Sequence, residues 1–233
     1  NYARVTGFIK SSEKVVGVEV QDEVSAEKFT LKARMIVNAA GPWVDDLRKA
    51  DGHINNKHLL LSKGVHIVMP HAKIPVKQSV YFDTPDKRMV FAIPRDGVTY
   101  IGTTDTEYKG SPDNPRITAE DQHYLIDACN QMFPGLSLKT SDIISSWTGL
   151  RPLVYEEGKS SSELSRKDEV FESPSGLISI AGGKLTGYRI MAKKVVNLVS
   201  KRLLSQGFKF EKCNTGNERI SGANFQEGED IES

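Results

Sequence analysis

The sequence has few of the residues that build covalent or metal-based cross-links. Its 233 residues include only two cysteines, Cys129 and Cys213, which lie far apart without a partner motif. Both are predicted to be reduced thiols in a cytosolic protein, because disulfide frameworks need recurring cysteines and an oxidising compartment. The five histidines do not cluster and have no metal-ligand spacing, which argues against a zinc site.

Long hydrophobic runs and an excess of either charge are also missing. No apolar run approaches the roughly 18 residues that can span a bilayer, so any membrane association is expected to be peripheral. The formal net charge of +1 does not indicate the excess of basic residues that a nucleic-acid-binding surface needs. The chain starts at Asn1 on a strand pattern, with neither an initiator methionine nor a signal peptide, which suggests a piece of a longer protein.

The common catalytic and nucleotide-binding signatures are absent as well. The chain has no G-x-G-x-x-G between a strand and a helix, the usual pyrophosphate cradle of dinucleotide-binding domains. It also has no Ser-His-Asp or Cys-His signature of nucleophilic catalysis. The composition, 38% hydrophobic and 26% charged, is that of an ordinary globular protein with one large domain or two modest ones.

Apolar periodicity divides the chain into two groups of elements. Residues 2–37 alternate and turn like a β-meander. Residues 35–41 form a strand that is continuously apolar up to Asn38 and is predicted to be buried on both faces. Residues 59–175 indicate a mostly antiparallel sheet with one helix. Residues 1–50 and 176–205 indicate one α/β layer, into which the antiparallel part is inserted.

Turn and cap signals place the elements of the inserted part. Strands are expected at 62–70, 79–82, 88–94, 98–103 and 143–154, with closing strands at 170–171 and 177–180. Asp96-Gly97 between two apolar alternations is a strong hairpin signal. Thr118 is predicted to cap a helix that ends at Pro134-Gly135. Residues 156–165 are expected to form a polar loop.

A strand that ends in two glycines and a lysine is the most suggestive local pattern. The strand runs into Gly182 and Gly183, and a long helix is predicted to begin at Lys184. Glycines let a ligand approach the backbone closely, and a helix start offers unpaired N–H groups and a positive dipole end. The segment is either a site for an anion or a carbonyl edge, or a plain turn with a solvated lysine, and the pattern leaves both open.

Arg151 lies in an apolar strand, between Leu150 and Pro152. A guanidinium there needs an anionic partner or exposure to solvent, because burying an unpaired charge is costly. Its planar fork fits a carboxylate or a phosphate. Arg151 could therefore bind an anionic ligand or form a structural ion pair with one of the acids of the chain.

His66 lies in the apolar run 65–69, where a histidine is more often a core or edge residue than a catalytic one. Its functional alternative is a general base, since the ordinary pKa of histidine lies near neutrality. Thr103-Thr104-Asp105 at a strand end could hydrogen-bond a ligand or form a simple turn, and the pattern favours the turn.

Five segments together resemble one known family. They are residues 37–44 (VNAAGPWV), 63–66 (KGVH), 101–110 (IGTTDTEYKG), 149–153 (GLRPL) and 181–189 (AGGKLTGYR). In this order they resemble the FAD-dependent, aerobic glycerol-3-phosphate dehydrogenases. The first segment alone would indicate only the wider group of amino-acid-oxidase-like flavoproteins. The last segment, together with residues 101–110, is much more specific.

The resemblance implies a mixed α+β and α/β fold of the amino-acid-oxidase-like type. The FAD-binding layer would comprise residues 1–58 and 176–205, the substrate-binding domain residues 59–175, and residues 206–233 a tail towards a helical C-terminal domain. In that family the dinucleotide-binding motif lies upstream of the point where this chain begins. The chain therefore resembles a middle fragment, which is expected to be inactive and colourless by itself.

The activity that the resemblance implies is oxidation of sn-glycerol 3-phosphate to dihydroxyacetone phosphate by hydride transfer to FAD. His66 would take the proton of the C2 hydroxyl, Arg151 and Lys184 would hold the substrate's phosphate and hydroxyl oxygens, and Thr104 would be a further substrate contact. The residues expected to contact FAD are Ala40, Gly41, Trp43, Gly182, Gly183, Lys184, Leu185 and Thr186.

The resemblance further implies a quinone acceptor, a peripheral contact with the inner face of the cell membrane, and a homodimer. The short link from Leu153 to Leu177 favours a dehydrogenase over a glycerol-phosphate oxidase that reduces oxygen. A related amino-acid oxidase is a second alternative, although a lysine beside the arginine suits a phosphate better than a carboxylate. A third is a cofactor-free binding or assembly module that uses the basic helix face and the acidic tail.

Overall fold

The structure, a computed structural model, describes residues 1–54, 57–155 and 167–221. These residues form two compact units, Asn1–Gly183 and Lys184–Ser233, and each is described by itself. The predicted polar loop at 156–165 lies outside the described residues.

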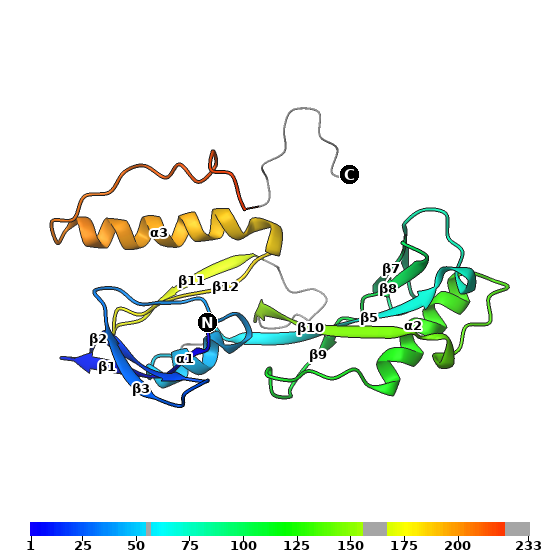
Figure 1. The fold of residues 1–233 in the computed structure, drawn as a ribbon, viewed down its shortest axis with the longest axis horizontal. Coiled ribbons are helices and arrows are strands. Elements are labelled where there is room, and N and C mark those ends of the chain that lie inside the picture. The colour runs from blue at the N-terminus through cyan, green and yellow to red at the C-terminus, as the bar shows by residue number, and fades with distance from the viewer. Residues whose placement is uncertain (55–56, 156–166, 222–233) are drawn as a thin grey trace. The chain divides into compact units, whose positions relative to one another are not determined.

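The N-terminal residues form a three-stranded antiparallel meander, as predicted. Its strands are β1 (Ala3–Ser11), β2 (Lys14–Asp22) and β3 (Lys28–Lys32), in that order across the sheet; they are blue in Figure 1. Val15 and Val20 on β2 are buried, whereas β3 is exposed along its whole length. Strict alternation and polar turns make this arrangement predictable from local pattern.

A second sheet joins segments that are far apart in the sequence. It contains β11 (Asp168–Glu172), β12 (Ile178–Gly182) and β4 (Val37–Asn38), in the order β11-β12-β4. β12 pairs with β4 in parallel and with β11 in antiparallel orientation. β11 therefore belongs to the same sheet as β4, and its assignment to the inserted antiparallel part was wrong.

The prediction of a strand buried on both faces at 35–41 was also wrong. β4 has only two residues, and Val37 is 40% exposed. Within the described residues, β4 pairs with β12 on one edge only, and the chain leaves the sheet at Gly41, whose φ is +57°. The apolar run therefore does not continue as a central strand among the described residues.

A short helix follows β4 and packs onto the second sheet. A 3-10 turn at Gly41–Trp43, with Pro42 in its first positions, leads into α1 (Val44–Ala50). The Asn38 side-chain amide donates to the Val44 carbonyl (2.9 Å) and to Ser179 Oγ (3.2 Å), which ties α1 to β12. The small core at this place consists of Val44, Val154, Phe171 and Ala181.

The third sheet is antiparallel throughout, as predicted for the inserted part. Its strands are β5 (Leu59–Pro70), β6 (Val80–Asp83), β7 (Met89–Arg95), β8 (Val98–Gly102), β9 (Thr106–Glu107) and β10 (Ser145–Val154). The order is β10-β5-β8-β7-β6, and β9 pairs with one end of β5. The long strand β5 is therefore central, with β10 on one side and β8 on the other.

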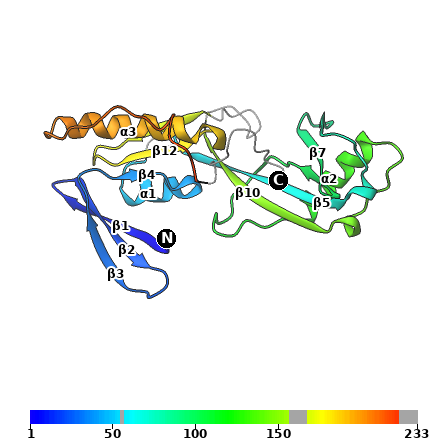
Figure 2. The same cartoon turned by 45° about the horizontal axis from the view of Figure 1, so that its top comes forward.

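One face of this sheet is covered by α2 (Ala119–Met132) (Figure 2). Thr118 caps the helix as predicted, in a capping box with Asp121. Lys63 of β5 forms a buried ion pair with Asp121. The core between helix and sheet consists of Val65, Ile67, Met69, Ile74, Phe82, Val90, Ala92, Ile101, Leu125, Ile126, Ala128, Cys129 and Leu138. Both cysteines of the chain are free.

The second unit contains α3 (Tyr188–Leu204), preceded by a 3-10 turn at Leu185–Gly187. The prediction that the helix begins at Lys184 was therefore wrong by one turn. Lys184 has extended backbone angles and no side-chain cap is present at either helix start, which explains why the boundary was not marked in the sequence. None of the helices in the described part of the chain has the length and apolar composition that crossing a bilayer requires.

Candidate functional site

His66 and Arg151 share the face of the third sheet that α2 does not cover. On β5 the residues 65, 67 and 69 point into the core against α2. Because side chains alternate along a strand, residues 62, 64 and 66 point to the other face. The β10 partners of these three are Arg151, Gly149 and Trp147, respectively, and directly paired residues lie on the same face.

The guanidinium of Arg151 lies over Gly64 of the neighbouring strand. A Cβ at Gly64 would come within 2.5 Å of both Nη atoms of Arg151, so only glycine leaves room for this side chain. Arg151 Nη2 donates to Thr103 Oγ1 (2.9 Å), and Nη1 lies 3.6 Å from Asp105 Oδ1. The side chain remains 26% exposed. Arg151 therefore has the structural ion pair that the sequence allowed and is still accessible to an anion.

His66 lies between a glycine and an aromatic ring. A Cβ at Gly102 of β8 would come within 2.2 Å of the imidazole, so Gly102 provides the space for it. The indole of Trp147 stacks on the other side, with ring centroids 4.9 Å apart. Burial, together with the positive charge of Arg151, lowers the pKa of His66 from its ordinary value of 6.5. The imidazole is therefore neutral at pH 7 and able to accept a proton.

Aromatic side chains extend this face beyond His66. Tyr100 of β8 packs edge-on against Trp147, with centroids 5.5 Å apart, and Trp147 is 45% exposed. Further along, Tyr81 and Phe91 stack at 4.2 Å. Trp147 and Tyr100 were not predicted as site residues, because only the strand register brings Trp147 beside His66 and Tyr100 beside Trp147.

The two threonines at the end of β8 have different roles. Thr104 is 1% exposed, and its hydroxyl accepts from the Val65 N–H (3.0 Å) and donates to the Lys63 carbonyl (3.2 Å). It thus continues the hydrogen bonding of β5 beyond the end of β8. Thr103 contacts Arg151 instead. The prediction that Thr104 contacts substrate stays a prediction.

The end of β4 presents backbone to open space. Gly41 has a φ of +57°, and a Cβ built there would meet nothing within 4 Å. Ala40 beside it is partly buried, and the Trp43 indole donates to Asp113 Oδ1 (2.9 Å). Side chains are thus kept away from this backbone, which leaves it approachable by a flat ligand.

The glycine pair at the end of β12 has left-handed backbone angles, with φ of +74° at Gly182 and +82° at Gly183. A Cβ at Gly182 would lie 2.4 Å from the Lys167 carbonyl oxygen, so packing against the start of β11 also requires this glycine. The predicted FAD contacts Lys184, Leu185 and Thr186 belong to the second unit, where all three are exposed.

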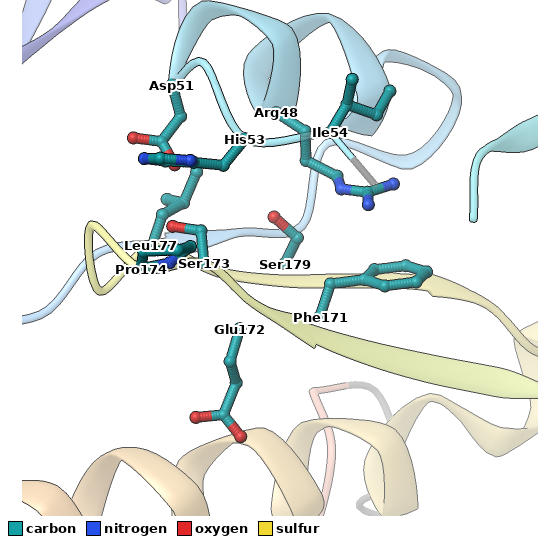
Figure 3. A pocket seen from close by; sticks show the side chains of 10 residues that line it. All are labelled: Arg48, Asp51, His53, Ile54, Phe171, Glu172, Ser173, Pro174, Leu177 and Ser179. Atoms are coloured by element: carbon teal, nitrogen blue, oxygen red, sulfur yellow. The ribbon is translucent and has the colours of Figure 1, made fainter. Parts of the chain in front are cut away.

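A separate cavity of about 220 Å³ lies beside α1 and the β11–β12 hairpin (Figure 3). It contains none of the predicted site residues. Its lining is Arg48, Asp51, His53, Ile54, Phe171, Glu172, Ser173, Pro174, Leu177 and Ser179. Burial alone would raise the pKa of Asp51, but hydrogen bonds from Ser175, Ser173 and Lys10 hold it below its usual value. Asp51, through Ser175, and Arg48, over the Phe171 ring, therefore hold α1 against the hairpin.

Comparison with known proteins identifies a flavoprotein sequence pattern. Residues 1–189 match the family described as DAO, FAD dependent oxidoreductase. The chain is 54% identical over 223 residues to an aerobic glycerol-3-phosphate dehydrogenase of Bacillus subtilis (strain 168), covering 95% of this chain and 40% of that protein. A Staphylococcus saprophyticus protein of the same name is 56% identical over 214 residues, covering 91% and 38%. The chain thus spans about two fifths of the length of these relatives.

Solved structures agree with the expected fold. The glycerol-3-phosphate dehydrogenase of Bacillus halodurans, complexed with FAD, is 49% identical with a TM-score of 0.85, over 96% of this chain and 42% of that one. The L-proline dehydrogenase of P. horikoshii shows the same fold at 14% identity and a TM-score of 0.54, over 90% and 51%. The expected amino-acid-oxidase-like architecture and the resemblance to the FAD-dependent glycerol-3-phosphate dehydrogenases are therefore confirmed.

Proposed function

This chain belongs to the FAD dependent oxidoreductase family, and on that premise we propose that the protein containing it oxidises sn-glycerol 3-phosphate to dihydroxyacetone phosphate. The observation that carries the proposal is that a partly exposed arginine, Arg151, and a neutral histidine, His66, lie on the same open face of the third sheet. The arginine suits the phosphate of the substrate and the histidine suits its reacting hydroxyl. Relatives that are 54% and 49% identical to this chain in the aligned region are named glycerol-3-phosphate dehydrogenases.

The described residues fit FAD as the cofactor. The unobstructed backbone at Gly41 and the two left-handed glycines at 182 and 183 are places where a Cβ would narrow the approach or strain the chain. Ala40, Gly41 and Trp43, with the segment 182–186, would hold the cofactor. When bound, FAD supplies the acceptor for the hydride.

Arg151 would bind the phosphate. A guanidinium presents two parallel N–H groups that match two phosphate oxygens. Its contacts with Thr103 and Asp105 limit its rotation before the substrate arrives, which lowers the entropy lost on binding. Lys184 and Thr104 remain proposed substrate contacts.

His66 would take the proton of the C2 hydroxyl. A base must be unprotonated at the working pH, and burial and the charge of Arg151 favour the neutral form of His66 by lowering its pKa. The Trp147 stack and the absent Cβ of Gly102 together fix the plane of its ring. Because removing the hydroxyl proton makes loss of hydride from C2 easier, a fixed base at this position speeds oxidation.

We further propose a quinone as the final acceptor, a peripheral attachment to the inner face of the cell membrane, and a cytoplasmic location of the catalytic part. The family likeness supports these points, and the short link from Leu153 to Leu177 supports a dehydrogenase. A homodimer is a further proposal from the same likeness.

Anaerobic reduction of the flavin in the full-length protein tests the activity. Stopped-flow mixing with sn-glycerol 3-phosphate should bleach the flavin absorbance, whereas glycine and proline should not. Reduction by an amino acid but not by glycerol 3-phosphate would contradict the proposal. Rapid reoxidation by a soluble quinone but slow reoxidation by oxygen is expected for a dehydrogenase, and the reverse order would identify an oxidase.

A further inference from the structure

Asp105 connects Arg151 to the central strand of the third sheet. Asp105 Oδ1 accepts a hydrogen bond from the Ser62 hydroxyl on β5 and lies 3.6 Å from Arg151 Nη1. Ser62 is completely buried, and Asp105 is only 17% exposed. The carboxylate is thus held by a buried group of the sheet rather than moving on the surface.

The guanidinium of Arg151 lies among Gly64, Thr103, Thr104 and Asp105. Gly64 lies beneath it, with no Cβ to displace it. Thr103 Oγ1 accepts from Nη2 (2.9 Å), whereas Nη1 donates to the Thr104 carbonyl (3.4 Å) and lies 3.6 Å from Asp105 Oδ1. Thr103 and Asp105 therefore contact different nitrogens of the planar guanidinium. These two contacts define both the position and the rotation of the group.

We propose that Asp105, held by Ser62, is a positioning residue that fixes the Arg151 guanidinium in the orientation that receives the substrate's phosphate. The inference rests on the proposed function, because it assumes that Arg151 binds that phosphate. Asp105 itself would not contact the substrate.

The negative charge of Asp105 should change the affinity for phosphate in the opposite direction to its positioning role, which makes the inference testable. A carboxylate near the guanidinium repels a phosphate, so a role through charge alone predicts tighter phosphate binding when the carboxylate is removed. A positioning role predicts weaker binding, because a displaced guanidinium loses its bidentate geometry. The sign of the change in affinity therefore distinguishes the two roles.

The experiment uses the full-length flavoprotein with Asp105→Ala, Asp105→Asn and Ser62→Ala. The dissociation constant for sn-glycerol 3-phosphate is taken from anaerobic flavin reduction, and inorganic phosphate is titrated as a competing anion. We expect weaker substrate binding in Asp105→Ala by about 10- to 100-fold, and a smaller effect in Ser62→Ala. Asp105→Asn keeps the size of the side chain and should lie between Asp105→Ala and the wild type.

A double-mutant cycle separates positioning from general loss of structure. In the Arg151→Lys background, Asp105→Ala should have little further effect on affinity, because the group that it orients is gone. An equal loss in both backgrounds, or tighter binding of phosphate in Asp105→Ala and Asp105→Asn, would overturn the inference. Glu107→Gln is the matched control, since Glu107 lies on β9 beside Ser62 but pairs with exposed Lys109, and its affinity should be unchanged.

The wild-type protein distinguishes failure of the inference from failure of the proposed function. A wild-type flavin that glycerol 3-phosphate does not reduce would refute the function on which the inference rests. A wild type that is reduced normally, with unchanged affinity in Asp105→Ala, would refute the inference alone.

Discussion

The imidazole of His66 lies flat against the indole of Trp147, with the ring planes only 6° apart and the centroids 4.9 Å apart. The two residues are directly opposite each other on β5 and β10. This stack fixes the plane of the histidine from one side, while Gly102 leaves room for it on the other. The proposed base is therefore oriented by the sheet rather than by a loop.

Replacing Trp147 should disturb the base without removing it. We expect Trp147→Leu to slow flavin reduction by glycerol 3-phosphate by about 2- to 10-fold, the range that corresponds to loss of one aromatic stack. Stopped-flow reduction of the full-length protein measures this rate. Tyr81→Leu removes another stacked aromatic of the same sheet and serves as control; an equal loss in both variants would argue against a specific role of Trp147.

Gly102→Ala should displace His66. The new Cβ would come within 2.2 Å of the imidazole, so the ring must rotate or the strands must separate. We expect a loss of stability together with a large fall in the rate of flavin reduction. Gly149→Ala on β10 is the stability control, because a Cβ there meets nothing within 4 Å. Equal thermal unfolding midpoints for the two variants would contradict the close contact between Gly102 and His66.

Removal of Arg151 should abolish productive binding. We expect Arg151→Ala to lower kcat/KM for glycerol 3-phosphate by at least about 100-fold, because the phosphate loses a bidentate charged partner. Steady-state kinetics of the full-length protein with a quinone acceptor measure the change. Arg95→Ala removes an exposed arginine from β7 of the same sheet and should leave kcat/KM unchanged. An unchanged kcat/KM in Arg151→Ala would remove this residue from the site.

The lowered pKa of His66 predicts a defined pH dependence of stability. Its folded-state pKa lies below the ordinary 6.5, so between these two values the unfolded chain binds more protons than the folded one. The free energy of unfolding should therefore fall as the pH is lowered from 6.5 through the folded-state pKa. Urea titrations of the chain at several pH values should show this dependence, and His66→Gln should reduce it. An identical dependence in His66→Gln would contradict the assignment.

The same shift predicts how activity varies with pH. Flavin reduction should rise with pH until His66 is neutral and then level off, with an apparent pKa below 6.5. His66→Asn should lower the plateau rate and remove this titration. A wild-type rate with an unaltered profile in His66→Asn would exclude His66 as the base.

The buried pair of Lys63 and Asp121 should matter for stability. Both side chains are less than one tenth exposed, and Asp121 also caps α2 through Thr118. Asp121→Ala leaves a buried ammonium without its carboxylate, which should destabilise the fold by about 3–5 kcal/mol. Chemical denaturation of the chain measures this loss. Asp127→Ala, at another position on the same helix, is the control and should have a much smaller effect.

Local pattern determined much of the fold in advance. The meander, the antiparallel inserted sheet and the Thr118 cap followed from alternation, turn residues and capping chemistry, all of which act over a few residues. The errors occurred where long-range pairing decides the outcome. The apolar run at 35–41 resembled a central strand, but in the part of the chain that the structure describes β4 pairs on one edge only. β11 joined β12 and β4 rather than the inserted sheet.

The sequence by itself determined which chemical groups are present, namely a strand arginine, a strand histidine and a glycine pair before a helix. It could not determine which groups meet, since contacts across strands depend on register, and a shift of one residue would turn each side chain to the other face. Only the tertiary structure placed Arg151 over Gly64 and His66 between Gly102 and Trp147. It also placed Asp105 beside Arg151, and this contact is the basis of the proposed role in orienting the phosphate-binding guanidinium.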